Sequence, residues 1–191
     1  MISIELKDKT YELPDRWGDV TIGKLQQLCE AYADGKDEVG AVTRAVSVLS
    51  GIPEEELLSL PYTEYAPMSG AISFMSADIP DKLLADFEFE GVTYSFQCDL
   101  ERMTAAEYID IETLSKDSSN ANLHLLMAIM YRPKGEKYDS GRVRARALIF
   151  KEHMTVDYAV GAQVFTSVLG QACSVRTPDY SAQFPQQKDQ E

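Results

Sequence analysis

The chain has 191 residues, of which 45% are hydrophobic and 26% charged, and its 18 Lys and Arg against 31 Asp and Glu give a formal net charge of −13 at pH 7. This length is sufficient for a hydrophobic core without disulfides or metal ions. The acidity argues against general binding to nucleic-acid backbones, and the apolar residues form short periodic runs, far below the roughly 20 consecutive apolar residues of a membrane span.

The start of the chain argues against secretion, and its cysteines argue against a disulfide framework. Residues 1–6 contain neither a basic nor a long apolar segment, so we expect no secretion signal and a cytosolic location. The three cysteines, Cys29, Cys98 and Cys173, are far apart and odd in number, which argues against a disulfide framework and against a CxxC metal site. We interpret them as small buried apolar residues, with a reactive thiol as the alternative.

The first predicted elements are a β-hairpin and a series of helices. Residues 2–13 alternate apolar and polar side chains around a turn at Lys7-Asp8-Lys9, which is typical of a hairpin. Thr21 is a suitable N-cap, and Pro53 followed by glutamates places negative charge where a helix begins. Apolar spacing predicts helices over 22–32, over 39–49, after Pro53, and over 62–77 with an interruption near Pro67.

The second half of the chain predicts another hairpin and three helices. Aromatic residues alternate with polar ones over 87–96, on either side of Glu90-Gly91. Thr104 and Glu107 have the Thr-x-x-Glu spacing of a capping box, which predicts a helix that begins there. Further helices are predicted over 122–131, ended by Pro133, and over 155–169, with a loop over 134–141.

Together these elements predict an α+β fold that is mostly helical. Because isolated hairpins are marginally stable, we expect the two hairpins to form one small antiparallel sheet covered by helices. We expect a single domain over 1–175. Residues 176–191 have the composition of a polar C-terminal tail, in which Tyr180 and Phe184 are the only apolar anchors.

The strongest candidate for catalysis is a carboxylate pair near a histidine. Glu107 and Asp110 share a helix face, and His124 on the next helix could complete a metal site. The structural interpretation is simpler, because Glu107 already has a role as a cap and a single histidine is usually not a ligand. His153 lies in no HxxxH or HExxH pattern, and the sequence contains no GxSxG, GxxxxGK or GxGxxG motif. We therefore expect no enzymatic activity, no cofactor and no metal.

A basic segment over 132–151 is the one candidate surface for an anionic group or a protein partner. Its arginines Arg132, Arg142, Arg144 and Arg146 are the candidate partner-binding residues, together with Tyr180 and Phe184 of the tail. Three of these arginines are spaced by two, so they share a face in an extended segment and point in different directions in a helix. The alternative is a solvated face paired with acids of the same molecule. The lack of interleaved aromatic residues argues against nucleic-acid contact.

The order of these modules resembles small virion and tail-assembly proteins of tailed bacteriophages. The resemblance rests on the Phe-Glu-Gly-x-x-Tyr turn at 89–94, the block at 99–111, the Met-Ala-x-x-Tyr-Arg-Pro ending of 123–133, and the end of the last helix at 164–170. It covers roughly residues 1–170. It implies a protein that acts by binding other phage proteins, and it carries no catalytic residue to transfer.

The resemblance implies a non-enzymatic assembly protein that binds another virion protein in the host cytoplasm, first of all as a tail-assembly chaperone. The alternative within this class is a stoichiometric virion component of the head–tail or portal-ring region. Either protein could also form homo-oligomers. A second class, suggested by the charge of −13, is an acidic nucleic-acid mimic that inhibits a host enzyme, although mixed lysines and acids at helix starts do not require such a role.

Overall fold

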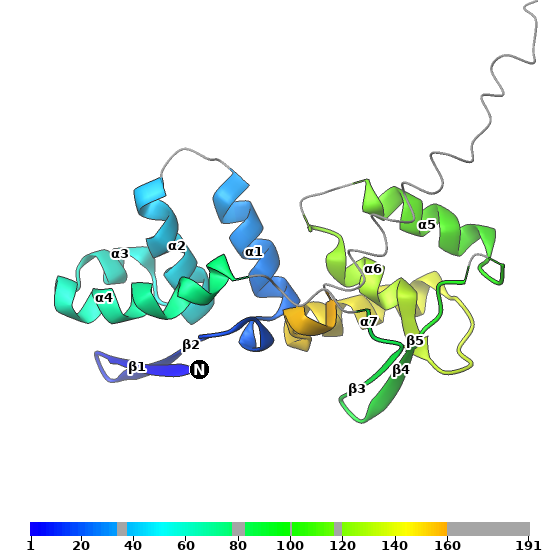
Figure 1. The fold of residues 1–191 in the computed structure, drawn as a ribbon, viewed down its shortest axis with the longest axis horizontal. Helices are drawn as coiled ribbons and strands as arrows, with labels where there is room; N and C mark the ends of the chain where they lie inside the picture. The colour runs from blue at the N-terminus through cyan, green and yellow to red at the C-terminus, as the bar shows by residue number, and fades with distance from the viewer. Residues whose placement is uncertain (34–37, 78–82, 100, 117–119, 160–191) are drawn as a thin grey trace, which may run out of the picture.

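The structure is a computed structural model that describes residues 1–33, 38–77, 83–99, 101–116 and 120–159. It has the predicted α+β fold, with helices around two small antiparallel sheets (Figure 1). The elements in chain order are β1 (Ile2–Leu6), β2 (Lys9–Leu13), η1 (Trp17–Asp19), α1 (Ile22–Ala33), α2 (Glu38–Ser50), α3 (Glu54–Leu58), α4 (Tyr62–Ala71), η2 (Ile72–Ser76), β3 (Asp86–Phe89), β4 (Val92–Phe96), α5 (Ala105–Ser115), α6 (Leu123–Met130), β5 (Tyr131–Pro133) and α7 (Ser140–His153).

Both predicted hairpins are confirmed, and each closes through a two-residue turn with positive φ angles. Lys7 and Asp8 connect β1 to β2 with φ angles of 45° and 65°, and Glu90 and Gly91 connect β3 to β4 with 49° and 74°. Such turns match the right-handed twist of the strands. The turns therefore fix the register that directs Leu13 and Phe87 into the core.

The expectation that the two hairpins join in one sheet is corrected. β1 and β2 form a sheet of their own, whereas β3, β4 and β5 form a second sheet in that order. The free edge of β4 is taken by β5, in which Arg132 is paired with Ser95. Figure 1 shows the two sheets in different halves of the molecule, the first beside α2 and the second beside α6 and α7. Each hairpin thus gains its stability from the helices beside it.

β5 also corrects the predicted helix over 122–131. α6 ends at Met130, and the next residues, Tyr131–Pro133, form the strand β5. Tyr131 is fully buried, and its hydroxyl donates to Leu84 O at 2.7 Å. Tyr131 thus anchors the chain just before β3 and lies directly after the end of α6. The local apolar pattern of the sequence does not reveal this distant contact.

The helices of the first half lie close to their predicted ranges. Thr21 accepts the amide of Lys24 at 3.3 Å ahead of α1, as expected for an N-cap. Pro53 precedes α3, whose first turn carries three glutamates. The interruption predicted near Pro67 is wrong, because α4 continues through Pro67 to Ala71 and only then changes to the 3-10 helix η2. Of the helix predicted over 155–169, the structure describes residues up to 159, and 156–159 are helical. The rest of that helix and the tail at 176–191 lie outside the described residues.

Among the described residues, α7 is the one long helix that the sequence pattern did not predict. Asp139 caps it by accepting the amide of Arg142 at 2.9 Å. Its buried side chains follow helical spacing, but a charged residue occupies one of the positions, and the buried residues are Val143, Arg146, Ala147 and Phe150. Leu148 and Ile149 lie on the exposed side instead. An arginine inside the apolar row and aliphatic residues outside it hide the amphipathic pattern.

The two halves of the chain meet where the start of α1 touches the end of α7. An isolated bridge pairs Thr21 with Thr155, and the Ile22 amide donates to Met154 O at 2.9 Å. Beside this joint, the buried Gln26 lies with its Nε2 2.9 Å from Asn120 O and 2.9 Å from His124 Nδ1. Buried apolar residues of both halves form one core. Within the described residues, no helix has the length and apolar content to cross a bilayer.

We predict that Gly23→Ala destabilises the protein at this joint. A Cβ atom at Gly23 would lie 2.8 Å from the backbone oxygen of Lys151, closer than side-chain carbons approach in folded proteins. We expect the free energy of unfolding in urea to fall by about 1–3 kcal/mol, as for an overpacked core. Gly70→Ala is the matched control, because a Cβ there meets nothing within 4 Å, and it should be neutral or stabilising by about 0.4–1 kcal/mol. Equal stability of the two variants would contradict a tight joint.

Candidate functional site

A buried ion pair connects the beginning of α5 to the end of α6. Arg132 Nη1 lies 2.5 Å from Glu107 Oε1, and their side chains are only 7% and 6% exposed. Glu107 also completes the predicted capping box, since its Oε2 accepts the Thr104 amide at 2.7 Å while Thr104 Oγ1 accepts the Glu107 amide. One carboxylate thus caps α5 and neutralises the arginine of β5.

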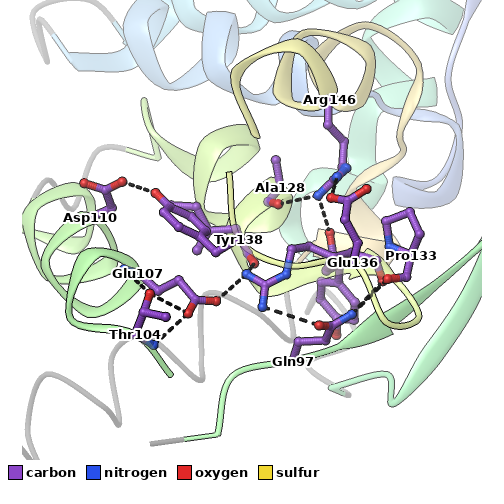
Figure 2. A network of polar contacts seen from close by, with 12 residues as sticks. Gln97, Thr104, Glu107, Asp110, Ala128, Pro133, Glu136, Tyr138 and Arg146 are labelled. Atoms are coloured by element: carbon purple, nitrogen blue, oxygen red, sulfur yellow. Dashed lines mark hydrogen bonds and ion pairs between the residues drawn. The ribbon is translucent and has the colours of Figure 1, made fainter. Parts of the chain in front are cut away.

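The rest of the Arg132 guanidinium is held by the chain around it. Nη1 donates to Ile129 O at 3.1 Å, and Nη2 donates to Gln97 Oε1 at 3.4 Å. The Gln97 amide in turn donates to the carbonyls of Arg132 and Pro133 at 3.2 and 3.1 Å, as Figure 2 shows. The guanidinium also lies 5.8 Å from the centre of the Tyr138 ring, within cation–π range.

A second buried arginine reaches the same helix end from α7. Arg146 Nη1 donates to Ala128 O at 3.0 Å and to Tyr131 O at 3.2 Å, and Nη2 pairs with Glu136 (Figure 2). Because Arg132 also donates to Ile129 O, two arginines form hydrogen bonds with carbonyls at the end of α6. Those carbonyls have no partner within the helix, so the cations both satisfy them and oppose the helix dipole.

The electrostatics of the network favour an ionised Glu107 and a neutral Tyr138. Burial alone would raise the pKa of Glu107, but the hydrogen bonds from Thr104 and the charge of Arg132 together hold it below the usual value. Burial and the neighbouring Asp110 raise the pKa of Tyr138, whose hydroxyl donates to Asp110 Oδ2. Burial also raises the pKa of Cys98 to about 12, so this thiol is protonated at neutral pH and is a poor nucleophile.

A cleft of about 930 Å³ opens beside this network. Its inner wall contains the Glu107–Arg132 pair, and its outer walls combine apolar side chains with exposed charges. The lining residues are Phe96, Gln97, Cys98, Asp99, Arg102, Met103, Thr104, Ala106, Glu107, Arg132, Lys137 and Tyr138. Arg102 is paired with Asp99 at 3.4 Å, whereas Lys137 forms no ion pair with any described residue. The cleft can therefore receive an apolar segment that carries a carboxylate.

The candidate partner-binding arginines divide into two groups. Arg132 and Arg146 are 5% and 7% exposed and are paired inside the molecule, so neither is available at the surface. This corrects their assignment to a partner-facing patch, and the reason is that both serve the end of α6. Arg142 and Arg144 are exposed on α7 while Arg146 is buried, so the three arginines point in different directions, as expected if this segment is helical. Tyr180 and Phe184 lie outside the described residues.

The carboxylate–histidine constellation is not assembled in the structure. Glu107 pairs with Arg132, Asp110 accepts from Tyr138, and His124 contacts Gln26. Burial lowers the pKa of His124, which favours the neutral imidazole that can accept the Gln26 amide. Among the described residues, no group of three or more His, Cys, Asp and Glu side chains is placed to hold a metal ion.

The sequence reasoning missed the partners that complete the network, namely Gln97, Glu136 and Tyr138. None of them has a local signal, because each acts on a residue from another element. A usable signal was the capping box itself: a glutamate expected near the core requires a cation, and Arg132 is the charged residue beside the most apolar helix.

Comparisons with known proteins gave no match: no protein-family model, no curated protein and no solved structure is significantly similar to this chain.

We predict that Arg132→Met lowers the free energy of unfolding by about 3–5 kcal/mol, because it leaves the buried Glu107 carboxylate without its cation. Arg102→Met is the matched control, since that side chain is 87% exposed and its ion pair with Asp99 lies at the surface. We expect the control to change stability by at most about 1 kcal/mol. Urea denaturation followed by circular dichroism measures both. A small effect of Arg132→Met would mean that the pair does not hold α5 and α6 together.

The same pair predicts a loss of stability in acid. Because the pKa of Glu107 is lower in the folded protein than its usual value of 4.5, the pair contributes fully above that pH. The contribution is lost as the pH falls below 4.5 and the carboxyl takes up a proton. Glu107→Gln should remove this part of the pH dependence. Melting temperatures of both proteins from pH 6 to about pH 3 test this, and parallel curves would contradict it.

Proposed function

We propose that this chain is a non-enzymatic assembly protein of a tailed bacteriophage, and that it acts as a tail-assembly chaperone by binding another virion protein. Its sequence resemblance to small phage assembly proteins supports the class. Two of the described modules that carry the resemblance contact each other in the fold. Glu107 comes from the block at 99–111 and Arg132 from the ending of 123–133, and they pair with each other. These two modules therefore pack together at this ion pair.

The observation that carries the proposal is the cleft beside the ion pair. Phe96, Met103 and Tyr138 provide apolar lining, and Lys137 provides a cation at its edge. A chaperone must cover apolar segments of its client, and an unbranched methionine adapts to different side chains. An apolar client segment with a nearby carboxylate therefore fits the cleft. The net charge of −13 would keep the complex soluble.

The polar groups of the cleft support binding over catalysis. Glu107 and Arg132 neutralise each other, and Tyr138 is hydrogen-bonded to Asp110. Catalysis by a carboxylate or a thiol requires a group free to exchange protons or attack a substrate. Cys98 has a pKa of about 12 and is thus protonated at neutral pH. These polar groups are therefore suited to form a fixed wall of the cleft.

The second candidate is a stoichiometric virion component. It is favoured by the exposed aliphatic and basic side of α7, which would suit a permanent neighbour. The nucleic-acid mimic is less favoured, because several acids already have structural roles, as Glu107 and Glu136 do in pairing with buried arginines. A row of carboxylates that mimics phosphates would have to lie free at the surface.

The first measurement is quantitative mass spectrometry of purified phage particles and of lysate from infected cells. A chaperone is abundant in lysate and absent from particles. Recovery of the chain in particles at a fixed ratio to tail or head–tail proteins would contradict the chaperone function and favour the virion component. Absence of any association with phage proteins in either sample would reject both.

A variant of the cleft tests client binding directly. We predict that Lys137→Glu reduces capture of an identified phage virion protein roughly tenfold, because it replaces an attraction with a like-charge repulsion at the edge of the cleft. Lys134→Glu is the matched control: it makes the same change on the same loop, but Lys134 is exposed and does not line the cleft. Affinity capture with both variants, quantified against the original chain, gives the comparison. Equal losses would mean that net charge, and not the cleft, controls binding.

A further inference from the structure

The outer side of α7 carries an unusual combination of exposed side chains. Leu148 is 61% exposed and Ile149 is 43% exposed. At 100° per residue, Ala145 lies between them on the helix surface, and Arg142 and Arg144 border the strip on its two sides. The Arg142 side chain is 68% exposed, and its Nη1 lies 3.8 Å from Glu136 Oε2, so this ion pair is long. We call these five residues the α7 outer face.

A second exposed apolar surface lies at the turn between α3 and α4. Leu58 is 72% exposed and Tyr62 is 79% exposed, which makes them the most exposed large apolar residues in the described chain. Glu54 and Glu55 precede Leu58 by four and three residues on α3, so their carboxylates lie on its side of the helix. We call these four residues the α3–α4 knob.

The two surfaces are complementary in character. The α7 outer face has aliphatic side chains between two arginines, and the α3–α4 knob has Leu58 and Tyr62 beside two glutamates. The three most exposed large apolar residues of the described chain, Tyr62, Leu58 and Leu148, belong to these two surfaces. Both surfaces are exposed within one molecule, and they lie in different halves of the fold (Figure 1). Neither surface therefore covers the other in the same copy.

We infer that the partner of the α7 outer face is a second copy of this chain, whose α3–α4 knob docks on it head to tail. Burial of Leu58 and Tyr62 against Leu148 and Ile149 would supply the apolar centre, and the Glu–Arg pairs at its edge would orient the copies. Each copy then has one knob and one face to offer. Such a heterologous contact repeats from copy to copy, and it produces a closed ring or an open filament.

The inference goes beyond the proposed function, because the client cleft shares no residue with either surface. The charge of −13 on each copy opposes association, and at about 0.15 M salt this repulsion is screened beyond roughly 8 Å. The opposite charges at the contact are closer than that. Self-association should therefore be stronger at physiological salt than at very low salt.

Light scattering coupled to gel filtration tests the inference on the full chain. We expect a mass above the 21.3 kDa of one chain that rises with protein concentration. Leu58→Glu and Leu148→Glu should each reduce it to that of a monomer. Ile109→Glu is the matched control, because Ile109 is 57% exposed on α5, outside both surfaces and outside the cleft. Circular dichroism and thermal melting verify that each variant is folded.

Mixing distinguishes the head-to-tail contact from other dimers. An equimolar mixture of Leu58→Glu and Leu148→Glu keeps one intact knob and one intact face, so it should form a heterodimer that does not grow further. A charge exchange gives a second test: Arg144→Glu should weaken association, and Glu55→Arg in the same chain should restore part of it. A monomer at all concentrations and salts, or variants that associate like the original chain, would overturn the inference. The cleft variants and the particle measurement test the proposed function separately.

Discussion

The second half of the fold depends on one buried ion pair. Arg132 stands at the point where α6 ends and β5 begins, and it is bound there by a carboxylate from the first turn of α5. Its backbone pairs with Ser95 of the sheet, while its side chain caps the helix that precedes it. A strand, a helix end and a helix start are thus tied at a single residue. Removing either charge would leave the other buried without compensation, which is the costly case for an ion pair.

Elements that are determined within a few residues could be predicted from the sequence. The hairpins follow from alternation around a turn, and the capping box at Thr104 needs only residues three apart. β5 and the division into two sheets could not be predicted, because they depend on pairing between segments distant in the chain. α7 could not be predicted for another reason. Arg146 occupies a position in the buried row of this helix where an apolar residue is expected, and its charge is compensated by Glu136.

The candidate site shows the same division between local and distant contacts. Glu107 was predicted as a cap, and this role is confirmed, but its partner Arg132 was interpreted as a surface cation. A run of arginines in a sequence normally indicates a solvated face, and here two of them satisfy helix carbonyls in the interior. These contacts form the internal scaffold, whereas the binding surfaces proposed above lie in the cleft and on exposed helices.

The joint between the two halves of the chain has a consequence for how the chain folds. The contacts of Gln26 with Asn120 and His124 span 94 and 98 positions of sequence. Those between Arg132 and Gln97, or between Arg146 and Ala128, span only 35 and 18. Loop closure costs more entropy as the separation grows, so contacts within each half form at lower cost than the joint. On a ribosome, the helices of the first half can pack together early. The first half can dock on the second half only after α7 has been synthesised.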